Sequence, residues 1–210
     1  MRVREGRIPF LARHLARLER SLEALAMPRP SRDLAALVTP FSGTGDAMLR
    51  LEVCDGRAVV TVRALPSLDP PSVITASEPH ALYPHKTTER DCFADAAGEA
   101  VVAEADDALL LTHEGWVAEG TVWSVCWWEG GGLRTAPLGL GILPGIGRAR
   151  VLEVAAATEV RCARPQLEGK SLLLVNAVRG VVPIASLDGA RVPHDARTSQ
   201  LARAFWPVAG

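Results

Sequence analysis

The sequence predicts an α+β fold in two parts of unequal size, on the basis of three observations. An amphipathic helical pattern near the start is followed by two alternating segments, which is typical of a small α/β domain. Prolines then interrupt every regular pattern, at positions 66, 70, 71, 79 and 84. Short apolar segments of strand length dominate the rest of the chain. We therefore expect a small N-terminal domain over residues 1–70, a proline-rich linker over 71–84 and a larger, strand-rich domain over 85–210.

The N-terminal part contains one clear helix and one clear hairpin. Leucines recur at steps of three and four over residues 11–26, which predicts a helix with one apolar face. Residues 48–54 and 58–65 alternate between apolar and polar side chains, as strands do, and Asp55-Gly56-Arg57 between them is a hairpin turn. Residues 31–47 remain ambiguous, and a short helix followed by a loop is one interpretation.

The C-terminal part alternates between short strands and two helices. We expect helices over residues 87–105 and 148–157, the second of them preceded by a glycine-rich turn over 139–147. Segments of strand length occur at 107–112, 116–119, 121–128, 133–135, 171–176 and 181–186. This mixture of strands and helices is the basis for the α+β assignment.

Composition excludes several classes of function. The chain has 210 residues, a formal net charge of −1 and 48% hydrophobic residues, so it can bury a core but has no basic field for nucleic acid or acidic membranes. No segment is long and apolar enough to span a bilayer, and no signal peptide follows Met1. The four cysteines are widely spaced with no CxxC pair, so we expect no metal site, no disulfide framework and a cytoplasmic location.

Lysine usage points to one amine. The chain has 21 arginines but only two lysines, Lys86 and Lys170. A guanidinium group stays protonated and cannot act as an amine nucleophile. A lysine in an arginine-rich chain is therefore a candidate for amine chemistry. Lys86 lies just before the helix expected from residue 87, and the positive end of a helix together with nearby cations disfavours the protonated amine. Only the neutral amine attacks an aldehyde, although an ordinary exposed lysine is the simpler alternative for Lys86 alone.

Glu119 is the second candidate. It stands among apolar and aromatic residues of two expected strands, where an unpaired carboxylate is costly. A protonated pyridine nitrogen would be a suitable partner, because the carboxylate keeps that nitrogen protonated and the ring can then accept electrons from a substrate carbanion. The alternative, a glutamate at a strand edge that faces water, is equally compatible with the pattern.

The third candidate is the turn at residues 141–148. A glycine-bearing turn that opens a helix exposes backbone N–H groups at the positive end of the helix dipole, which suits a phosphate. An ordinary glycine-rich turn is the alternative. A dinucleotide fingerprint is disfavoured, because the preceding segment is short and no acidic residue follows a second strand of a βαβ unit.

Arg17 is the fourth candidate. It lies beside the apolar face of the first expected helix, from where its guanidinium could hold a buried anion through two hydrogen bonds. A solvated cation on a helix surface is the ordinary alternative.

Four motifs carry a family resemblance through their order and spacing. They are His-x-x-Arg-Leu at residues 14–18, Lys-x-x-x-Arg at 86–90, Glu-Gly-Thr at 119–121 and Leu-Pro-Gly-Ile-x-Arg at 143–148. Together they resemble the class IV aminotransferases, the fold-type IV pyridoxal-phosphate enzymes that include aminodeoxychorismate lyase and the branched-chain and D-amino-acid aminotransferases. The resemblance extends from Arg2 to Pro183 and implies a small α/β domain, a larger C-terminal domain and a cofactor between them.

The resemblance also implies roles for individual residues. Lys86 matches the lysine that binds the cofactor aldehyde and moves protons at the substrate α-carbon, and Glu119 matches the partner of the pyridine nitrogen. Arg17 matches the arginine that holds the cofactor phosphate. The backbone around the phosphate is matched by Ile146 and Gly147 in the turn and by Asn176 and Ala177 at the end of a late strand.

Three departures from the family pattern stand out. The family has several strands before the His-x-x-Arg-Leu helix, and these are missing from the expected elements here. It usually has threonine where Gly147 stands, so one hydroxyl contact to the phosphate would be lost while the backbone N–H groups remain. Serine and asparagine usually follow Glu-Gly-Thr, where this chain has Trp123 and Ser124, and Trp123 fills space near the cofactor or packs in the core.

For function, the resemblance implies an enzyme with pyridoxal 5'-phosphate, a small-molecule amino substrate and a homodimeric assembly. The strings around Lys86 and over residues 174–180 resemble aminodeoxychorismate lyases of folate biosynthesis, which release pyruvate and form 4-aminobenzoate. The Gly-Ile-Leu-Pro-Gly-Ile string at 141–146 instead resembles the transaminases. A paralogue that binds the cofactor without turnover is the third alternative.

Overall fold

The computed structural model describes residues 1–67 and 69–207, without the side chains of residues 42–44. The chain divides into two compact units. The first comprises residues 1–67 together with the short segment 177–179, and the second comprises residues 69–176 and 180–207 as far as they are described. Both units combine helices with sheet, so the α+β prediction is confirmed.

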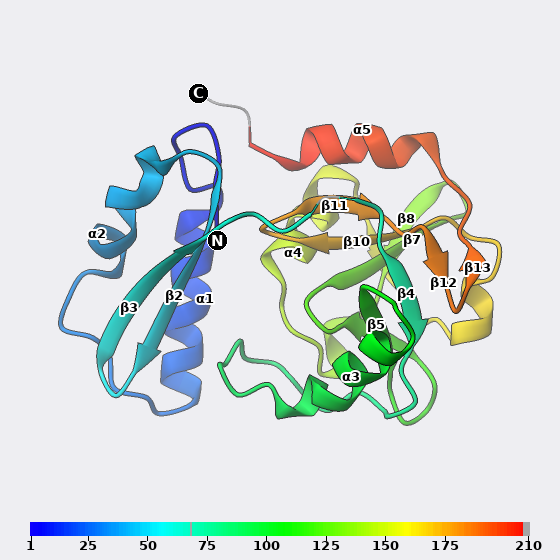
Figure 1. Cartoon of the computed structure of the whole chain (residues 1–210), viewed down its shortest axis with the longest axis horizontal. Helices are drawn as coiled ribbons and strands as arrows, with labels where there is room; N and C mark the ends of the chain where they lie inside the picture. Colours follow the sequence, from blue (N-terminus) through cyan, green and yellow to red (C-terminus); the bar gives the residue numbers. More distant parts are fainter. Residues whose placement is uncertain (68, 208–210) are drawn as a thin grey trace. The chain divides into compact units, whose positions relative to one another are not determined.

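The first unit packs helix α1 (Leu11–Ala24) and the short helix α2 (Leu34–Val38) with an antiparallel sheet of order β1-β2-β3 (Figure 1). Strand β1 is Arg2–Val3, and β2 (Ala47–Cys54) pairs from Met48 to Cys54 with the whole of β3 (Arg57–Arg63). A two-turn 3-10 helix, η1 (Thr39–Thr44), links α2 to the sheet. The core of this unit is Val3, Ala47 and Leu49, with Phe41 and Val60 against them.

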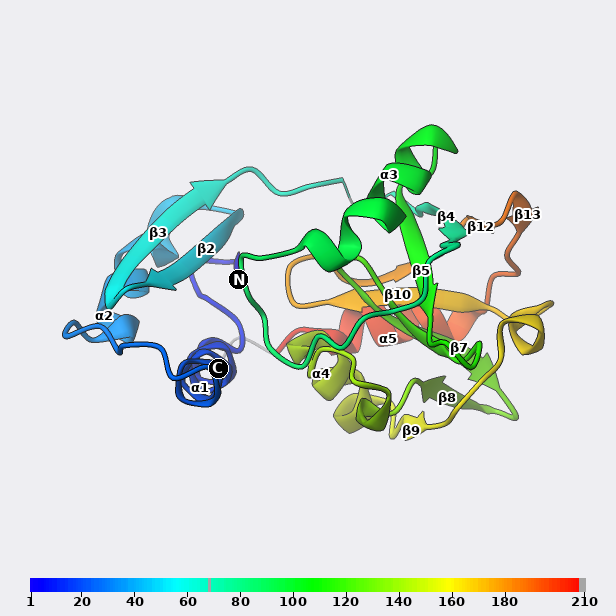
Figure 2. The same cartoon turned by 90° about the horizontal axis from the view of Figure 1, so that it is seen from below.

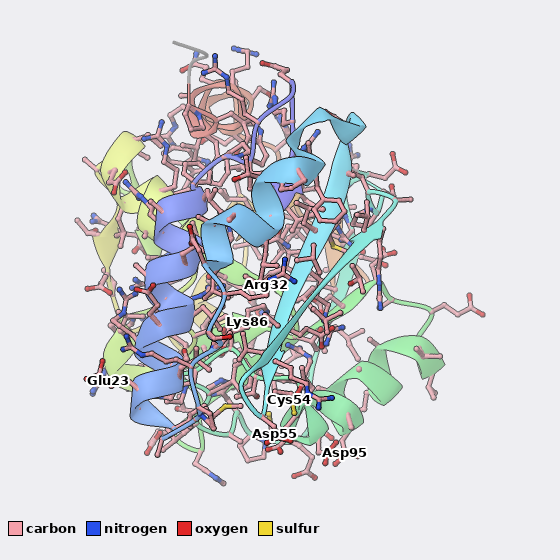
Figure 3. All side chains as sticks on the ribbon, turned by 90° about the vertical axis from the view of Figure 1, so that its left-hand side faces the viewer. Glu23, Arg32, Cys54, Asp55, Lys86 and Asp95 are labelled. Atoms are coloured by element: carbon pink, nitrogen blue, oxygen red, sulfur yellow. The ribbon has the colours of Figure 1, made fainter. Side chains whose placement is uncertain are left out.

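The hairpin turn follows from backbone conformation. Asp55 and Gly56 both have positive φ, 48° and 71°, which is the conformation that a two-residue turn with the right-handed strand twist requires. Cys54 and Asp55 lie at the tip of this hairpin (Figure 3). Aspartate and glycine are among the residues that adopt positive φ most readily, so the hairpin turn could be predicted from the sequence.

One expectation about this unit was wrong. The sequence analysis found no strand before α1, yet Arg2 and Val3 pair with Met48 and Ala47 of β2. Two residues are too few to show an alternating pattern, so only the tertiary pairing defines this strand.

The second unit is built on a large sheet of order β11-β10-β7-β6-β5-β4-β12-β13. Its central strands are β5 (Asp107–Leu111), β6 (Val117–Gly120), β7 (Ser124–Glu129) and β10 (Leu172–Asn176). The outer strands are β4 (Ser72–Thr75), β11 (Gly180–Pro183), β12 (Ser186–Leu187) and β13 (Ala190–Arg191), while β8 (Gly132–Thr135) extends from β7 to β9 (Thr158–Glu159). The central strands are almost wholly buried, which explains why they appear in the sequence as continuous apolar runs.

Helices cover this sheet on both sides. Helix α3 (Ala94–Val102), preceded by η2 (Asp91–Phe93), lies on one side, and α4 (Ile146–Val154) and α5 (Ala196–Phe205) lie on the other (Figure 2). Two further 3-10 turns, η3 (Leu138–Leu140) and η4 (Arg164–Leu167), lie in the connections. The main core includes Trp123, Trp127 and Leu174, and a second cluster around Phe93 and Leu110 lies under α3. No helix of the two described ranges is long and apolar enough to cross a bilayer.

The structure changes three expectations for this unit. Part of the segment assigned to the linker, Ser72–Thr75, forms β4, which pairs in parallel with β5 and β12. Proline at 70 and 71 marks the entry to this strand and does not interrupt it. The helix expected from residue 87 starts only at Asp91 with η2 and ends at Val102, and helix α5 was not expected at all.

Candidate functional site

Glu119 lies at the centre of the second unit. It is on β6, and its side chain is only 5% exposed, so the alternative of a strand-edge glutamate in water is excluded. Its Oε1 lies 2.9 Å from Nε2 of His80 and accepts the backbone N–H of Leu143 at 3.2 Å. Its Oε2 accepts that same N–H at 3.3 Å. The carboxyl group of Glu119 is therefore buried and has hydrogen-bond partners on both of its oxygens, as a buried polar group requires.

Asp107 holds the turn after Glu119 in place through hydrogen bonds from Thr121. This aspartate is 4% exposed, and its Oδ1 accepts the hydroxyl of Thr121 at 2.5 Å and the backbone N–H of Thr121 at 3.2 Å. Burial raises the pKa of Asp107, an effect that these hydrogen bonds oppose. A Cβ on Gly120 would lie 3.0 Å from Oδ2 of Asp107, so the glycine of Glu-Gly-Thr allows the close approach. The sequence analysis did not single out Asp107.

The segment after Leu143 leads directly into α4, which begins at Ile146. Gly145 is the residue before the helix and offers no side-chain cap. Among the described residues, no hydrogen bond of the N–H groups of Ile146 and Gly147 is found, although both residues are buried. The first N–H groups of a helix have no acceptor within the helix, and an anion is an acceptor that also suits the helix dipole.

Gly147 explains the departure from the usual threonine. A Cβ at this position would lie 2.8 Å from both the Cα and the carbonyl carbon of Asn176, and 3.0 Å from Cγ1 of Val175. The end of β10 therefore lies directly against the first turn of α4. Asn176 is in turn linked to the β6–β7 turn, because its Nδ2 donates to the carbonyl of Val122 at 3.4 Å. The structure thus brings Ile146, Gly147 and Asn176 together.

Lys86 lies on the irregular segment between β4 and η2, and its side chain is exposed. Tyr83 ties this segment to η3 through its N–H, which donates to the carbonyl of Gly141 at 2.8 Å. The Tyr83 hydroxyl accepts a hydrogen bond from the N–H of Thr87 at 3.0 Å and donates one to the carbonyl of Thr87 at 3.1 Å. These bonds hold the backbone directly after Lys86. Arg90 closes the segment by donating to the carbonyl of Thr121.

Two consequences follow for the choice of amine. Lys86 is five residues before the first helical residue, Asp91, so the argument that a helix dipole destabilises its protonated form does not apply. Its segment is nevertheless fixed to Gly141 and Thr121, which border the loop before α4 and the Glu119 turn. Lys170, the other lysine, forms an ion pair with Glu129.

Arg17 and Ala177 belong to the first unit. Arg17 is half-buried on α1, and Ala177 begins the segment 177–179 that links β10 to β11. Glu119, Ile146, Gly147, Asn176 and Lys86 all belong to the second unit.

Two further residues singled out in the sequence, one in a motif and one just after a motif, serve the fold. Arg148, in the Leu-Pro-Gly-Ile-x-Arg string, is 3% exposed, donates from Nε and Nη2 to the carbonyl of Ala136 and forms an ion pair with Glu159. Trp123 is 3% exposed and belongs to the main core cluster, which decides between its two sequence interpretations in favour of core packing.

His80 is the functional candidate that the sequence analysis missed. Its imidazole is 1% exposed and touches Glu119, which is 39 residues away in the chain. A single histidine in a proline-rich stretch carries no periodic or motif signal, so only the tertiary structure reveals this pair.

Comparison with known proteins places the chain in a family. The profile of "Amino-transferase class IV" matches residues 1–187. A Schizosaccharomyces pombe protein named "Putative aminodeoxychorismate lyase" is 26% identical over 193 residues, which cover 84% of each chain.

Solved structures agree with this assignment. A fold IV transaminase from Curtobacterium pusillum superposes with a TM-score of 0.81 at 26% identity, over 98% of this chain and 81% of the other. The fold is also shared with the pyridoxal-phosphate-bound form of a hypothetical aminotransferase from Mycobacterium tuberculosis, with a TM-score of 0.86, 22% identity and coverage of 97% and 85%. The chain belongs to the class IV aminotransferase family and is a pyridoxal-phosphate-dependent enzyme.

Proposed function

We propose that this enzyme is an aminodeoxychorismate lyase, which releases pyruvate from aminodeoxychorismate and leaves 4-aminobenzoate. The observation that carries the proposal is the hydrogen bond from the N–H of Leu143 to Glu119 on β6, which ties this buried carboxyl group to the short segment that leads into Ile146 and Gly147 at the start of α4. The relative from Schizosaccharomyces pombe, matched over most of both chains, favours the lyase over other activities of the family.

The donor set fits the cofactor at both of its ends. Leu143, whose N–H binds Glu119, and Ile146 at the start of α4 are three residues apart, so their Cα atoms are separated by at most about 11 Å. That separation suits one pyridine ring with its phosphate arm. Glu119 would bind the ring nitrogen through Oε2, and the backbone of Ile146 and Gly147 would bind the phosphate.

The remaining predicted residues complete the proposed cofactor site. Asn176 would line the phosphate side through its backbone, since it packs directly against Gly147. Arg17 and Ala177 are proposed as further phosphate-side contacts on the strength of the family resemblance. A guanidinium at Arg17 would supply the positive charge that backbone N–H groups provide only in part.

Lys86 is the proposed proton carrier. When bound, the cofactor supplies an electron sink for a carbanion on the carbon that bears the substrate amino group. Lys86 would take the proton from that carbon, and the conversion of aminodeoxychorismate into 4-aminobenzoate and pyruvate then consumes no oxidant and no net water. Lys170 is unsuited to this task, because Glu129 holds its ammonium group in an ion pair.

A transaminase of branched-chain or D-amino-acid type is the second candidate. It is favoured by the fold IV transaminase from Curtobacterium pusillum, which matches this chain at a similar identity. The proton removed by Lys86 would then be returned to the cofactor in place of pyruvate loss.

A pyruvate assay separates these activities. Purified enzyme loaded with pyridoxal phosphate is given aminodeoxychorismate, and pyruvate is followed by coupling to lactate dehydrogenase. The proposal expects pyruvate and 4-aminobenzoate in equal amounts. In parallel, a panel of L- and D-amino acids with 2-oxoglutarate measures transamination, which should be slower by a large factor. Transamination without pyruvate release from aminodeoxychorismate would favour the second candidate, and a yellow protein that performs neither reaction would be a cofactor-binding paralogue.

Assembly and location are part of the same proposal. A homodimer is proposed from the family resemblance, and light scattering of the loaded enzyme would measure it. A cytoplasmic location is proposed from the four free cysteines, which suit a reducing compartment.

A further inference from the structure

His80 is a buried imidazole with one polar side-chain contact. It follows β4, its backbone N–H donates to the carbonyl of Leu111 at 2.6 Å, and its ring lies 6.4 Å from that of Phe93 between centroids. Nε2 lies 2.9 Å from Oε1 of Glu119. Nδ1 is buried and has no hydrogen-bond partner among the described residues. Among the described residues, Glu119 is therefore the polar side chain that the imidazole contacts, and no other polar side chain contacts it.

This contact makes the two oxygens of Glu119 unequal. Oε1 lies 2.9 Å from Nε2 of His80 and accepts the N–H of Leu143 at 3.2 Å, whereas Oε2 has only the longer contact of 3.3 Å with the shared N–H of Leu143. An ionised carboxylate has about four acceptor sites, so Oε2 is the oxygen with capacity for a strong donor. Rotation of the carboxylate would break its shortest hydrogen bond.

We propose that His80 is a positioning residue that holds Glu119 with Oε2 facing the cofactor ring and thereby keeps the ring nitrogen protonated. The inference rests on the proposed role of Glu119. A histidine that donates from Nε2 occupies Oε1, so the remaining acceptor capacity of the carboxylate is on Oε2. Without that donor, Oε1 and Oε2 compete for Leu143 and the ring nitrogen, and the geometry that favours the protonated ring is lost.

The test compares three replacements that differ in where they place a donor. His80→Leu keeps volume and removes the hydrogen bond. His80→Gln places an amide N–H near the position of Nε2, whereas His80→Asn places one near the position of Nδ1 and cannot reach Glu119. Each variant is loaded with pyridoxal phosphate labelled with ¹⁵N in the ring, and the nitrogen chemical shift reports ring protonation directly. Dissociation constants for the cofactor and rates of solvent deuterium exchange at the α-carbon of an amino-acid ligand are measured on the same samples.

The wild-type and His80→Gln proteins are expected to show the protonated-ring signal. His80→Leu and His80→Asn should shift it toward the unprotonated ring and slow α-proton exchange by about tenfold, the scale expected for one hydrogen bond to a charged group. Cofactor affinity should change much less, because the phosphate contacts are untouched. If a variant is too unstable to load, the comparison of His80→Gln with His80→Asn, two amides of similar polarity, still decides the question.

An unchanged ring-nitrogen signal in the loaded His80→Leu or His80→Asn protein would overturn the inference and leave His80 with a packing role. That result is separable from failure of the proposed function. If borohydride fixes the labelled cofactor onto Lys86 of the wild-type protein, the proposed site stands whatever the His80 variants do. If the wild-type protein takes up no cofactor, both proposals fail.

Discussion

Glu119 accepts the backbone N–H of Leu143, 3.2 Å from Oε1, and this bond joins a buried carboxylate to the segment that opens α4. Groups that suit two chemically different parts of the cofactor therefore lie close together. The carboxylate suits a protonated ring nitrogen, and the N–H groups of Ile146 and Gly147 suit a phosphate. The short segment from Leu143 to Gly147 sets the distance between the carboxyl group of Glu119 and these N–H groups. Substitutions at its two ends should therefore affect the chemistry and the binding of the cofactor separately.

Glu119→Gln should keep the cofactor bound but slow turnover by on the order of 100-fold, because the carboxamide removes the negative charge that favours a protonated ring. Its N–H₂ group can donate to the ring nitrogen and so leave it unprotonated. The measurement is kcat alongside cofactor affinity, with Glu114→Gln, an exposed change on the nearby turn, as the control. Unchanged turnover in Glu119→Gln would remove Glu119 from the mechanism.

Gly147→Thr introduces the usual family residue but should weaken the protein. The new Cβ would lie 2.8 Å from backbone atoms of Asn176, which cannot move as a flexible side chain can. Overpacking of this kind costs about 1–3 kcal/mol, and the displaced start of α4 should also bind phosphate less well. Thermal unfolding and cofactor titration test this expectation. The control is Gly139→Ala, where a Cβ meets nothing within 4 Å. Tighter cofactor binding by Gly147→Thr would show that the backbone yields and that the hydroxyl contact is recovered.

Local signals in the sequence identified much of the fold. The hairpin at Asp55 and Gly56, helix α1 and the buried strands β5, β6 and β10 follow from turn chemistry and periodicity. Strand β4 and the late start of α3 could not be predicted from such local signals. Tertiary contacts define both, because β4 has only four residues beside two prolines and α3 follows an irregular segment.

The candidate site shows the same division. The apolar neighbours of Glu119 left a buried and a water-facing side chain equally open, and the structure shows the buried one. The glycine turn before a helix predicted the start of α4, with its backbone N–H groups, near the place where the structure has it. The environment of Lys86 was predicted wrongly in one respect, since no helix begins beside it. His80 and Asp107 were missed, because each contacts the Glu119 turn across a long stretch of sequence.

The ion pair of Arg148 with Glu159 gives a pH-dependent contribution to stability. The hydrogen bond from Arg148 holds the pKa of Glu159 below its usual value of 4.5. A carboxyl with a lowered pKa in the folded state stabilises the fold above its unfolded pKa, and this contribution is lost as pH falls through the folded value. Glu159→Gln should therefore lower the melting temperature at pH 7, and its difference from wild type should shrink below about pH 4.5. The same melts of Glu78→Gln, an exposed control, should follow wild type at every pH, and a difference for Glu159→Gln that persists at low pH would refute the assignment.

The four thiols should differ sharply in reactivity. Burial raises the pKa of the Cys126 thiol to about 12 and also raises the pKa of Cys162, whereas Cys54 and Cys92 are exposed. Since the thiolate is the reactive form, a disulfide reagent should modify two thiols quickly in the native protein and all four after unfolding. Cys54→Ser with Cys92→Ser should abolish the fast phase. Rapid modification of Cys126 would mean that β7 opens in solution.

The most direct test of the central claim is to reduce the cofactor-loaded protein with borohydride and map the modified peptide by mass spectrometry. The account predicts the reduced cofactor on Lys86, no modification of Lys170, loss of labelling and turnover in Lys86→Ala, and nearly full activity in Lys170→Ala. Labelling of Lys170, or equal loss of activity from both replacements, would contradict it.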